Sequence, residues 1–149
     1  MERELGIMED YYRLCNDNKS EPAVICYMFV ISSTEPITVN QLKDSMAILV
    51  NRHPLLRMRI QKVNNKHIWR EINTFTPDTM DITENPTDDW QTELSETVNV
   101  PFDLEHGPLW SIRILPNATC ELFDESSMDV HHVVLAFRFS HTIADGLGK

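Results

Sequence analysis

Positive charge and long apolar stretches are both scarce in this sequence. Lysine and arginine number 13 against 23 aspartates and glutamates, which gives a net charge of −10 at neutral pH. Without a basic surface to neutralise phosphates, the chain is not expected to bind nucleic acid. The longest apolar run, Ala23–Ile31, has nine residues, whereas a membrane-spanning helix needs about 20. We therefore expect no transmembrane segment.

Glycine and cysteine are scarce as well. Only 4 of the 149 residues are glycine and 42% are hydrophobic, a composition typical of a globular domain and not of a disordered chain. The cysteines, Cys15, Cys26 and Cys120, are odd in number and have no CxxC spacing, which indicates reduced thiols. The opening residues MERELGIMEDYY are acidic and do not form a basic, apolar leader. We therefore expect one domain with a cytoplasmic location.

Apolar periodicity predicts a domain that mixes helices and strands. Helices are expected over residues 2–14, with Leu5, Met8 and Tyr12 on the core face, from a capping box at 38–41 to Pro54, and over 90–99. Strands are expected over residues 23–31, 56–63, 67–72, 110–115 and 132–139. Residues 73–89 and 116–130 are predicted to be loops. The predicted class is α/β in the broad sense, an α+β sandwich with a mostly antiparallel sheet and flanking helices.

Two of these elements carry a prediction about burial. The strand over 23–31 is almost continuously apolar, which indicates burial on both faces. The helix over 90–99 is expected to bury Trp90, Leu94 and Val98.

The most chemically suggestive residues close the sequence, in FSHTIADGLGK at residues 139–149. The apolar alternation of the last strand continues to His141, just beyond the strand end. An imidazole held there could take a proton from a hydroxyl or an amine near neutral pH. Asp145 follows within reach of a tight turn, and Gly146 permits backbone angles that other residues resist. The pattern predicts a general base with a structural acid.

Other interpretations of these residues stay open at the level of spacing. The pattern H-x-x-x-D-G also fits a capped strand end with a surface histidine and a turn aspartate. A metal site would bring His131 and His132 together with His141, but eight strand residues at about 3.3 Å each keep them apart. We therefore predict no metal. No serine or cysteine lies in a nucleophile-elbow context, so a nucleophilic triad is not indicated.

Three segments, in this order, resemble the condensation-type acyltransferases. They are NRHPLLRMRI at 51–60, VPFDLEHGPLWSIRIL at 100–115 and FRFSHTIADGLG at 137–148. This superfamily includes chloramphenicol acetyltransferase, the condensation domains of nonribosomal peptide synthetases and the alcohol acetyltransferases. RELGIMEDYY at 3–12 resembles the start of the alcohol acetyltransferase branch. Ser140 favours the same branch, since condensation domains usually carry a second histidine at that position.

The resemblance implies a chloramphenicol acetyltransferase-like lobe that transfers an acetyl or other acyl group from a CoA thioester to a small alcohol or amine. His141 would be the general base and Gly146 the turn glycine. Asp145 would be structural and would pair with an arginine. Acyl-CoA would be a co-substrate, with no bound cofactor, and His53 would be a helix-end histidine and not a second base. The candidates for the arginine, besides one in a second lobe, are Arg57, Arg59 and Arg138.

In the resembling family two similar lobes enclose the reaction channel, and the catalytic histidine ends the first lobe. We therefore expect residues 1–149 to be the N-terminal lobe, with the second lobe absent and an exposed lobe interface that promotes self-association. Two alternatives to the alcohol acyltransferase stay open. One is a condensation or lipid acyltransferase domain with a carrier-bound donor, and the other is a non-catalytic remnant that binds a partner.

Overall fold

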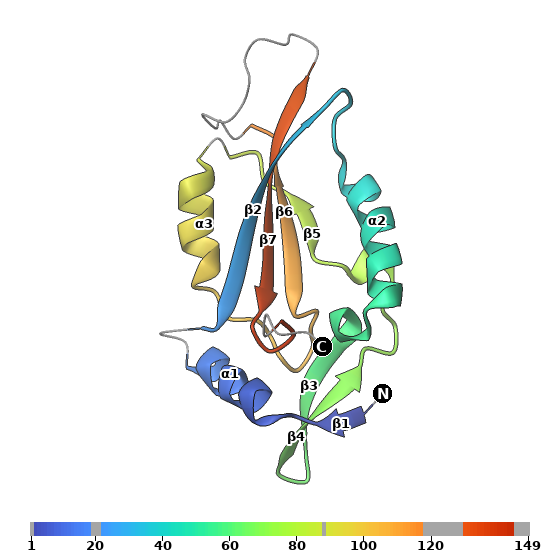
Figure 1. Ribbon diagram of the computed structural model, residues 1–149, viewed down its shortest axis with the longest axis vertical. Helices are drawn as coiled ribbons and strands as arrows, with labels where there is room; N and C mark the ends of the chain where they lie inside the picture. Colours follow the sequence, from blue (N-terminus) through green and yellow to red (C-terminus); the bar gives the residue numbers. More distant parts are fainter. Residues whose placement is uncertain (1, 19–21, 88, 118–129, 145–149) are drawn as a thin grey trace.

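A computed structural model describes residues 2–18, 22–87, 89–117 and 130–144, and Figure 1 shows their arrangement around two sheets. The helices within this part are α1 (Ile7–Asp17), α2 (Val39–Arg52), α3 (Trp90–Val98) and two short 3₁₀ helices, η1 (Pro54–Arg57) and η2 (Pro77–Thr79). The strands are β1 (Glu2–Glu4), β2 (Val24–Ser33), β3 (Met58–Val63), β4 (Lys66–Glu71), β5 (Ile82–Glu84), β6 (Trp110–Leu115) and β7 (His131–Ser140).

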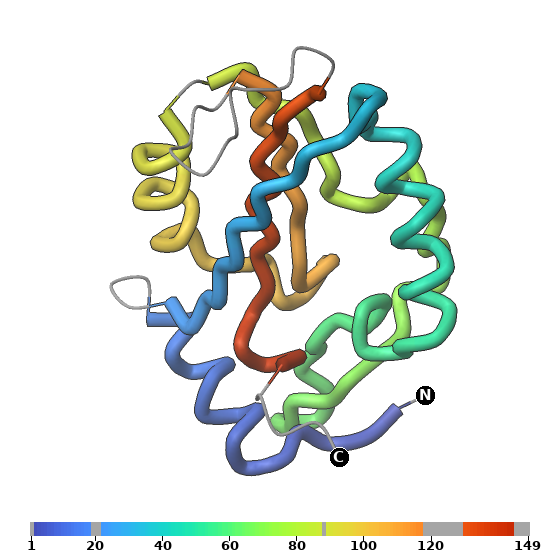
Figure 2. Tube along the Cα trace, turned by 45° about the horizontal axis from the view of Figure 1, so that its top comes forward, coloured from blue at the N-terminus to red at the C-terminus, as the bar shows by residue number. Residues whose placement is uncertain are grey.

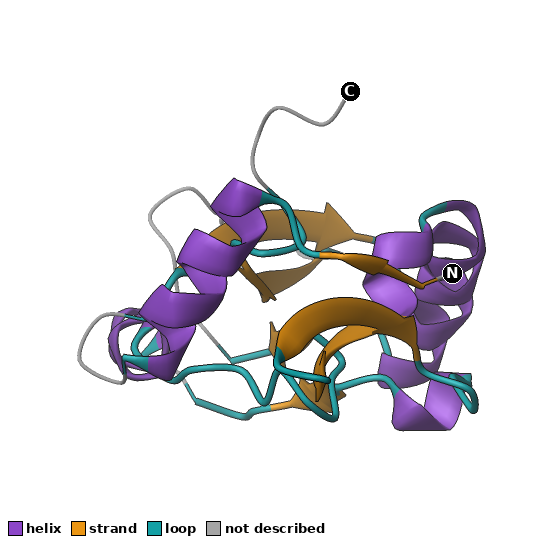
Figure 3. Cartoon of the chain, turned by 90° about the horizontal axis from the view of Figure 1, so that it is seen from below, coloured by secondary structure: helices purple, strands orange, loops and turns teal. Residues whose placement is uncertain are grey.

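The larger sheet has the strand order β2-β7-β6-β5, and the smaller one has the order β1-β4-β3. Every neighbouring pair is antiparallel except β5 with β6. This confirms the predicted mixed class with a mostly antiparallel sheet and flanking helices. Figure 3 shows the helices at the two sides of the strands.

The two faces of the larger sheet are covered by different helices. On one face Ile114, Val133 and Leu135 pack against residues of α2 and the segment before it. On the other face Leu115 and Val134 pack against Trp90 of α3 and Met28 of β2. Adjacent residues of a strand point to opposite faces, so β6 and β7 carry apolar side chains on both sides. These two strands therefore form the centre of the fold.

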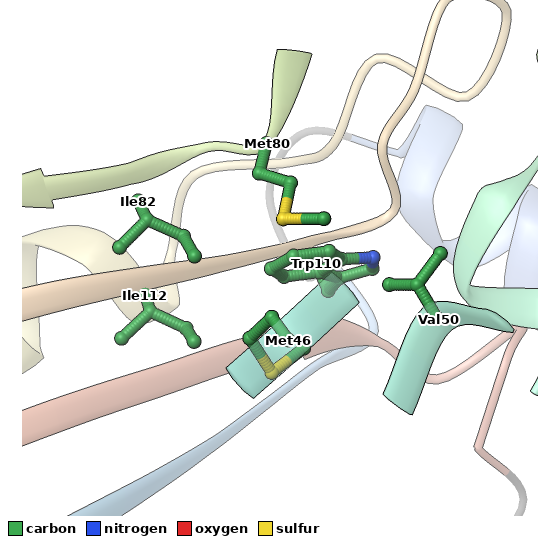
Figure 4. Packing of buried hydrophobic residues seen from close by; sticks show 6 residues of the cluster. All are labelled: Met46, Val50, Met80, Ile82, Trp110 and Ile112. Carbon is green, nitrogen blue, oxygen red and sulfur yellow. The ribbon is translucent and has the colours of Figure 1, made fainter. Parts of the chain in front are cut away.

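The core on the α2 face is built around Trp110, which is fully buried. Figure 4 shows its indole among Met46 and Val50 of α2, Met80, and the isoleucines of β5 and β6. The indole N–H donates a hydrogen bond of 2.7 Å to the carbonyl of Leu56. The apolar contacts of the ring join β6 to α2, and the hydrogen bond of its N–H joins β6 to η1.

Local signals account for α2 and for the β3–β4 hairpin, and both predictions are confirmed. Thr38 accepts a hydrogen bond from the amide of Gln41, whose side chain in turn accepts from the Thr38 amide. This capping box starts α2, and Pro54 follows its end. At the hairpin, Asn64 and Asn65 both have positive φ, 48° and 65°, which asparagine tolerates and which the tightest hairpin turn requires.

The prediction of one helix over residues 2–14 is wrong at its start and for Met8. Glu2–Glu4 forms β1, which pairs with β4, and α1 begins only at Ile7. Glu9 causes the break because its carboxylate accepts hydrogen bonds from the Gly6 amide and from Arg3. Met8 is exposed instead of packed in the core.

Two further predictions are wrong, one about the burial of a strand and one about a loop. β2 is not buried on both faces: Tyr27 is 54% and Phe29 49% exposed, and the strand is at the edge of its sheet. Residues 73–89 are not only a loop, since they contain η2 and β5 and bury Met80 and Ile82. Both errors arise because burial depends on neighbours that a local apolar pattern does not identify.

The other predicted segments differ less from the structure. The strands predicted at 110–115 and 132–139 correspond to β6 and β7. The last helix is α3, but Trp90, Leu94 and Val98 are only half-buried. Of the loop predicted at 116–130, residues 118–129 lie outside the described part, as does Cys120.

Removal of the Trp110 ring tests whether this core holds the fold. We expect Trp110→Ala to lower the free energy of unfolding by about 3–5 kcal/mol, because it leaves a large cavity. Trp110→Phe should fall between this variant and the wild type, since it keeps most of the apolar contact and loses the hydrogen bond to Leu56. Urea denaturation measures both. Ile48→Ala, at an exposed position of α2, is the control and should change stability by less than about 0.5 kcal/mol.

The start of α1 predicts a pH-dependent contribution to stability. Burial alone would raise the pKa of Glu9, but hydrogen bonds from Arg3 and from the Gly6 amide outweigh it and lower the pKa below 4.5. A carboxylate with a lowered pKa stabilises the folded state above its ordinary pKa, and this contribution is lost as the pH falls through the folded value. Glu9→Gln should therefore lower the urea midpoint at pH 7, and the difference from wild type should narrow below pH 4.5.

The matched control for this comparison is Glu96→Gln, which changes an exposed glutamate on α3. Its urea midpoint should equal that of the wild type throughout the same pH range. A Glu9→Gln difference that stays constant from neutral to acidic pH would contradict the role assigned to the carboxylate.

Candidate active site

The structure places His141 directly after β7, at the end of the sheet where α1 lies (Figures 1 and 2). The amide of His141 donates a hydrogen bond of 2.8 Å to the carbonyl of Ala23, which continues the ladder between β7 and β2. On the other side of the strand, the Ser140 amide donates to the carbonyl of Leu109 at 2.9 Å. The backbone that carries His141 is therefore held from both sides.

The residues around His141 form a compact turn. The hydroxyls of Ser140 and Thr142 lie 2.8 Å apart, and the amide of Ile143 donates to the Ser140 carbonyl at 3.1 Å. Ser140 is fully buried and Thr142 almost so. Serine at this position thus has a structural role here, since its small hydroxyl satisfies a second buried hydroxyl inside the turn.

The imidazole of His141 stacks on the ring of Tyr12 from α1. The two ring centroids lie 3.9 Å apart and the ring planes differ by 15°. Nδ1 of His141 is enclosed and has no hydrogen-bond partner within the described part of the chain. Because a substrate cannot reach an enclosed atom, Nε2 is the ring nitrogen available for proton transfer. A base that accepts a proton at Nε2 carries its own hydrogen on Nδ1.

Asp145 and Gly146 lie outside the described residues, so their roles stay predictions. Of the arginines that could pair with Asp145, Arg57 is already bonded to the carboxylate of Glu71 and to the carbonyl of Val50. Arg59 and Arg138 each have an enclosed Nε without a hydrogen-bond partner in the described residues.

Arg138 is buried among backbone groups of the connector 99–109 and side chains of the sheet. Its Nη2 donates a hydrogen bond of 2.7 Å to the carbonyl of Val100. Its guanidinium lies over the ring of Phe102, 4.9 Å from the ring centroid. Burial, and to a smaller degree the charge of Arg113, lowers the pKa of Arg138 below its usual value. The cation–π contact and the carbonyl compensate part of the cost of burying this charge.

The connector is held on its other side by α1. The side-chain amide of Asn16 donates to the carbonyl of Phe102 at 2.9 Å, and the Phe102 amide donates back to Asn16 Oδ1 at 3.0 Å. Sequence reasoning missed Tyr12, Asn16 and Phe102 as parts of this site. Tyr12 is predicted only as a core residue, and the contacts of Asn16 lie 86 residues away in the sequence, where no local pattern reveals them.

A pocket of about 560 Å³ opens between α1, β3, β4 and this connector. Its wall is mixed in character, with the basic side chains Arg13 and Lys62, with His67, and with acidic residues of α1 and the connector. Asn16 and Phe102 line the pocket, but His141 does not. The pocket therefore lies beside the candidate base and does not contain it.

Residues suited to metal binding are dispersed in the described ranges. No three histidine, cysteine or acidic side chains there are close enough to hold an ion. His131 begins β7 and His141 follows its end, so they lie at opposite ends of a ten-residue strand.

None of the described helices is both long and apolar enough to cross a membrane. His53, at the end of α2, is exposed and donates its amide to Leu49.

A family model for the condensation domain matches residues 15–146. Among solved structures, the starter condensation domain of rhizomide synthetase RzmA has a TM-score of 0.69 and 14% identity, over 95% of this chain and 34% of that one. A mutant of that domain in complex with C8-CoA has a TM-score of 0.68 and 13% identity, over 95% and 31% of the two chains. Holo-AB3403, a four-domain nonribosomal peptide synthetase bound to AMP and glycine, has a TM-score of 0.59 and 16% identity, over 96% of this chain and 11% of that one.

No curated protein sequence is significantly similar to this chain. The chain spans about a third of the length of the RzmA domains that it matches. At these low identities the structural likeness establishes the fold alone. The family model, in contrast, covers most of the sequence and includes the segment that carries His141. The chain therefore belongs to the condensation domain family, and it matches the N-terminal portion of that fold.

Proposed function

We propose that the protein containing this chain transfers an acyl group from a CoA thioester to an alcohol, with His141 as the general base. The observation that carries this proposal is the placement of the imidazole. Backbone hydrogen bonds on both sides hold the residue, the ring is stacked on Tyr12, and only Nε2 is available to a substrate. A base held this rigidly loses little of its efficiency to misorientation.

In the proposed reaction Nε2 of His141 takes the proton from the acceptor hydroxyl. The oxygen then attacks the thioester carbonyl, and a C–O bond forms to give a tetrahedral oxyanion. Collapse of this intermediate breaks the C–S bond, and the departing thiolate takes the proton from the imidazolium. The products are an ester and CoA, and the histidine returns to its starting state. Groups that stabilise the oxyanion are expected from a second lobe.

The donor and the acceptor are supported by different observations. One RzmA starter condensation domain was solved in complex with C8-CoA, which supports an acyl-CoA donor for this chain as well. The serine at 140 and the segment Arg3–Tyr12 support an alcohol acceptor, because they resemble the alcohol acetyltransferase branch. We assign Asp145 the structural role of pairing with an arginine, and Gly146 that of the turn glycine.

We further propose that residues 1–149 form the N-terminal lobe of a two-lobe enzyme. The exposed apolar side chains of β2 and α1, among them Tyr27, Phe29 and Ile7, would meet the second lobe. In its absence they would favour self-association of the lobe.

A second candidate is peptide-synthetase-type condensation, in which a carrier protein holds the donor and the acceptor is an amine. The solved neighbours support its amine acceptor, because AB3403 is a nonribosomal peptide synthetase and one structure of the RzmA starter condensation domain contains Leu-SNAC together with C8-CoA. The two candidates share the base and differ in the bond that is formed, an ester in one and an amide in the other.

Replacement of the proposed base tests the mechanism. In the protein that carries both lobes, His141→Ala is expected to lower kcat/KM by roughly 10²–10⁴, the usual contribution of a general base. The matched control is His53→Ala, because His53 is exposed and its hydrogen bonds to Leu49 and from Leu56 use the backbone alone. It should leave the rate unchanged. Full activity in His141→Ala would refute the assignment of the base.

A donor and acceptor panel separates the two candidate functions. Acetyl-CoA, C8-CoA and a carrier-bound acyl group are each offered with a set of alcohols and with Leu-SNAC, and the products are identified by mass spectrometry. We expect esters from the CoA donors. Amide formed only from the carrier-bound donor would favour the condensation reaction instead. A folded two-lobe protein that forms neither product would favour a non-catalytic remnant that binds a partner.

A further inference from the structure

We propose that Phe102 is a positioning residue that sets the stack of Tyr12 on His141, acting through Asn16 on one side and Arg138 on the other. The catalytic part of this inference rests on the proposed function, because the position of Phe102 affects the reaction rate only if His141 is the base. The geometric part, that Phe102 controls the orientation of the imidazole, is testable without any catalytic assay.

The first half of the device links Phe102 to the helix that carries Tyr12. Asn16 is buried, with 4% of its surface exposed, and both ends of its side-chain amide are bonded to the backbone of Phe102. Tyr12 and Asn16 are four residues apart in α1, so they lie one above the other on the same face of the helix. A shift of Phe102 would therefore move the helix face that bears the Tyr12 ring.

The second half links Phe102 to the strand that carries His141. Arg138 is 6% exposed, lies three residues before His141, and places its guanidinium over the Phe102 ring. Its hydrogen bond to the Val100 carbonyl ties the same side chain to the connector two residues earlier. The planar guanidinium has a preferred orientation over an aromatic face, so Phe102 and the end of β7 are fixed relative to each other.

Together these contacts form a closed circuit. It runs from His141 to Tyr12, along α1 to Asn16, across to Phe102, and back through Arg138 to the end of β7. Two buried polar side chains, Asn16 and Arg138, form hydrogen bonds with the backbone of the irregular connector. Without these hydrogen bonds, burial of the polar groups would be destabilising. A purely structural role would need only the apolar contact of Phe102 with the core, whereas this circuit uses both its backbone and the face of its ring.

The test measures the imidazole directly by NMR of the chain. A ring stacked at 3.9 Å shifts the carbon-bound protons of His141 upfield, and Tyr12→Leu removes that shift and calibrates it. Asn16→Leu and Phe102→Leu should move the His141 resonances toward their positions in Tyr12→Leu. Leu104→Ala is the matched control, because Leu104 belongs to the same connector and packs in the same core cluster as Phe102. It should destabilise the fold and leave the stack in place.

A conservative replacement keeps the inference falsifiable if Phe102→Leu fails to fold. Phe102→Tyr retains the aromatic face for Arg138 and should keep the wild-type His141 resonances. Arg138→Met retains the aliphatic length of the side chain but loses the guanidinium plane. It should move the His141 resonances away from their wild-type positions. Unchanged resonances in Arg138→Met and Asn16→Leu would overturn the inference, as would an equal movement in Leu104→Ala.

Kinetics of the two-lobe protein separate this inference from the proposed function. Asn16→Leu should lower kcat more than it changes the KM for the acyl donor, since the imidazole that takes the proton is misplaced. Loss of the stack by NMR without a change in kcat would overturn the catalytic role of Phe102. Undiminished activity in His141→Ala would instead refute the proposed function, and the measured geometry of the stack would still stand.

Discussion

The pairing of β7 with its two neighbours is the constraint on which the rest of the structure depends. β7 is bonded antiparallel to β2 along all ten of its residues and to β6 along six. A slip of one residue would exchange the side chains that face α2, Val133 and Leu135, with those that face α3. The same register delivers His141 to the end of the sheet, opposite Ala23. The position of the candidate base is therefore a consequence of sheet pairing and not of the turn alone.

The irregular connector between α3 and β6 is the second element that shapes the site. It has few regular backbone hydrogen bonds of its own and is fastened by buried polar side chains from α1 and β7. Within it, burial would raise the pKa of Asp103, but hydrogen bonds from His106 outweigh this effect and lower the pKa. The ionised carboxylate thus stabilises the turn that leads into β6. Rigidity at the site comes from side chains wherever the backbone is irregular.

The described surface carries exposed apolar side chains on β2 and on α1. Tyr27 and Phe29 stand next to each other on the edge strand, and the Tyr27 ring also contacts Phe139. On α1, Ile7 and Tyr11 lie one turn apart and are both exposed. Exposed apolar patches of this kind mark interaction surfaces. Tyr27 contacts Phe139 near the end of β7, and α1 lies at that same end of the sheet (Figure 1), which supports the proposal that a second lobe completes the site.

The sequence by itself determined the elements whose signals are local. The capping box at Thr38 starts α2, Asn64 and Asn65 select the hairpin turn, and the alternation of β7 ends at His141. Tertiary structure alone decided that Glu2–Glu4 is a strand, that β2 is an edge, and that Asn16 and Arg138 meet at Phe102. The reason is physical: caps and turns are satisfied by neighbours in the chain, whereas burial depends on elements distant in the sequence and the Asn16 contact joins residues 86 positions apart.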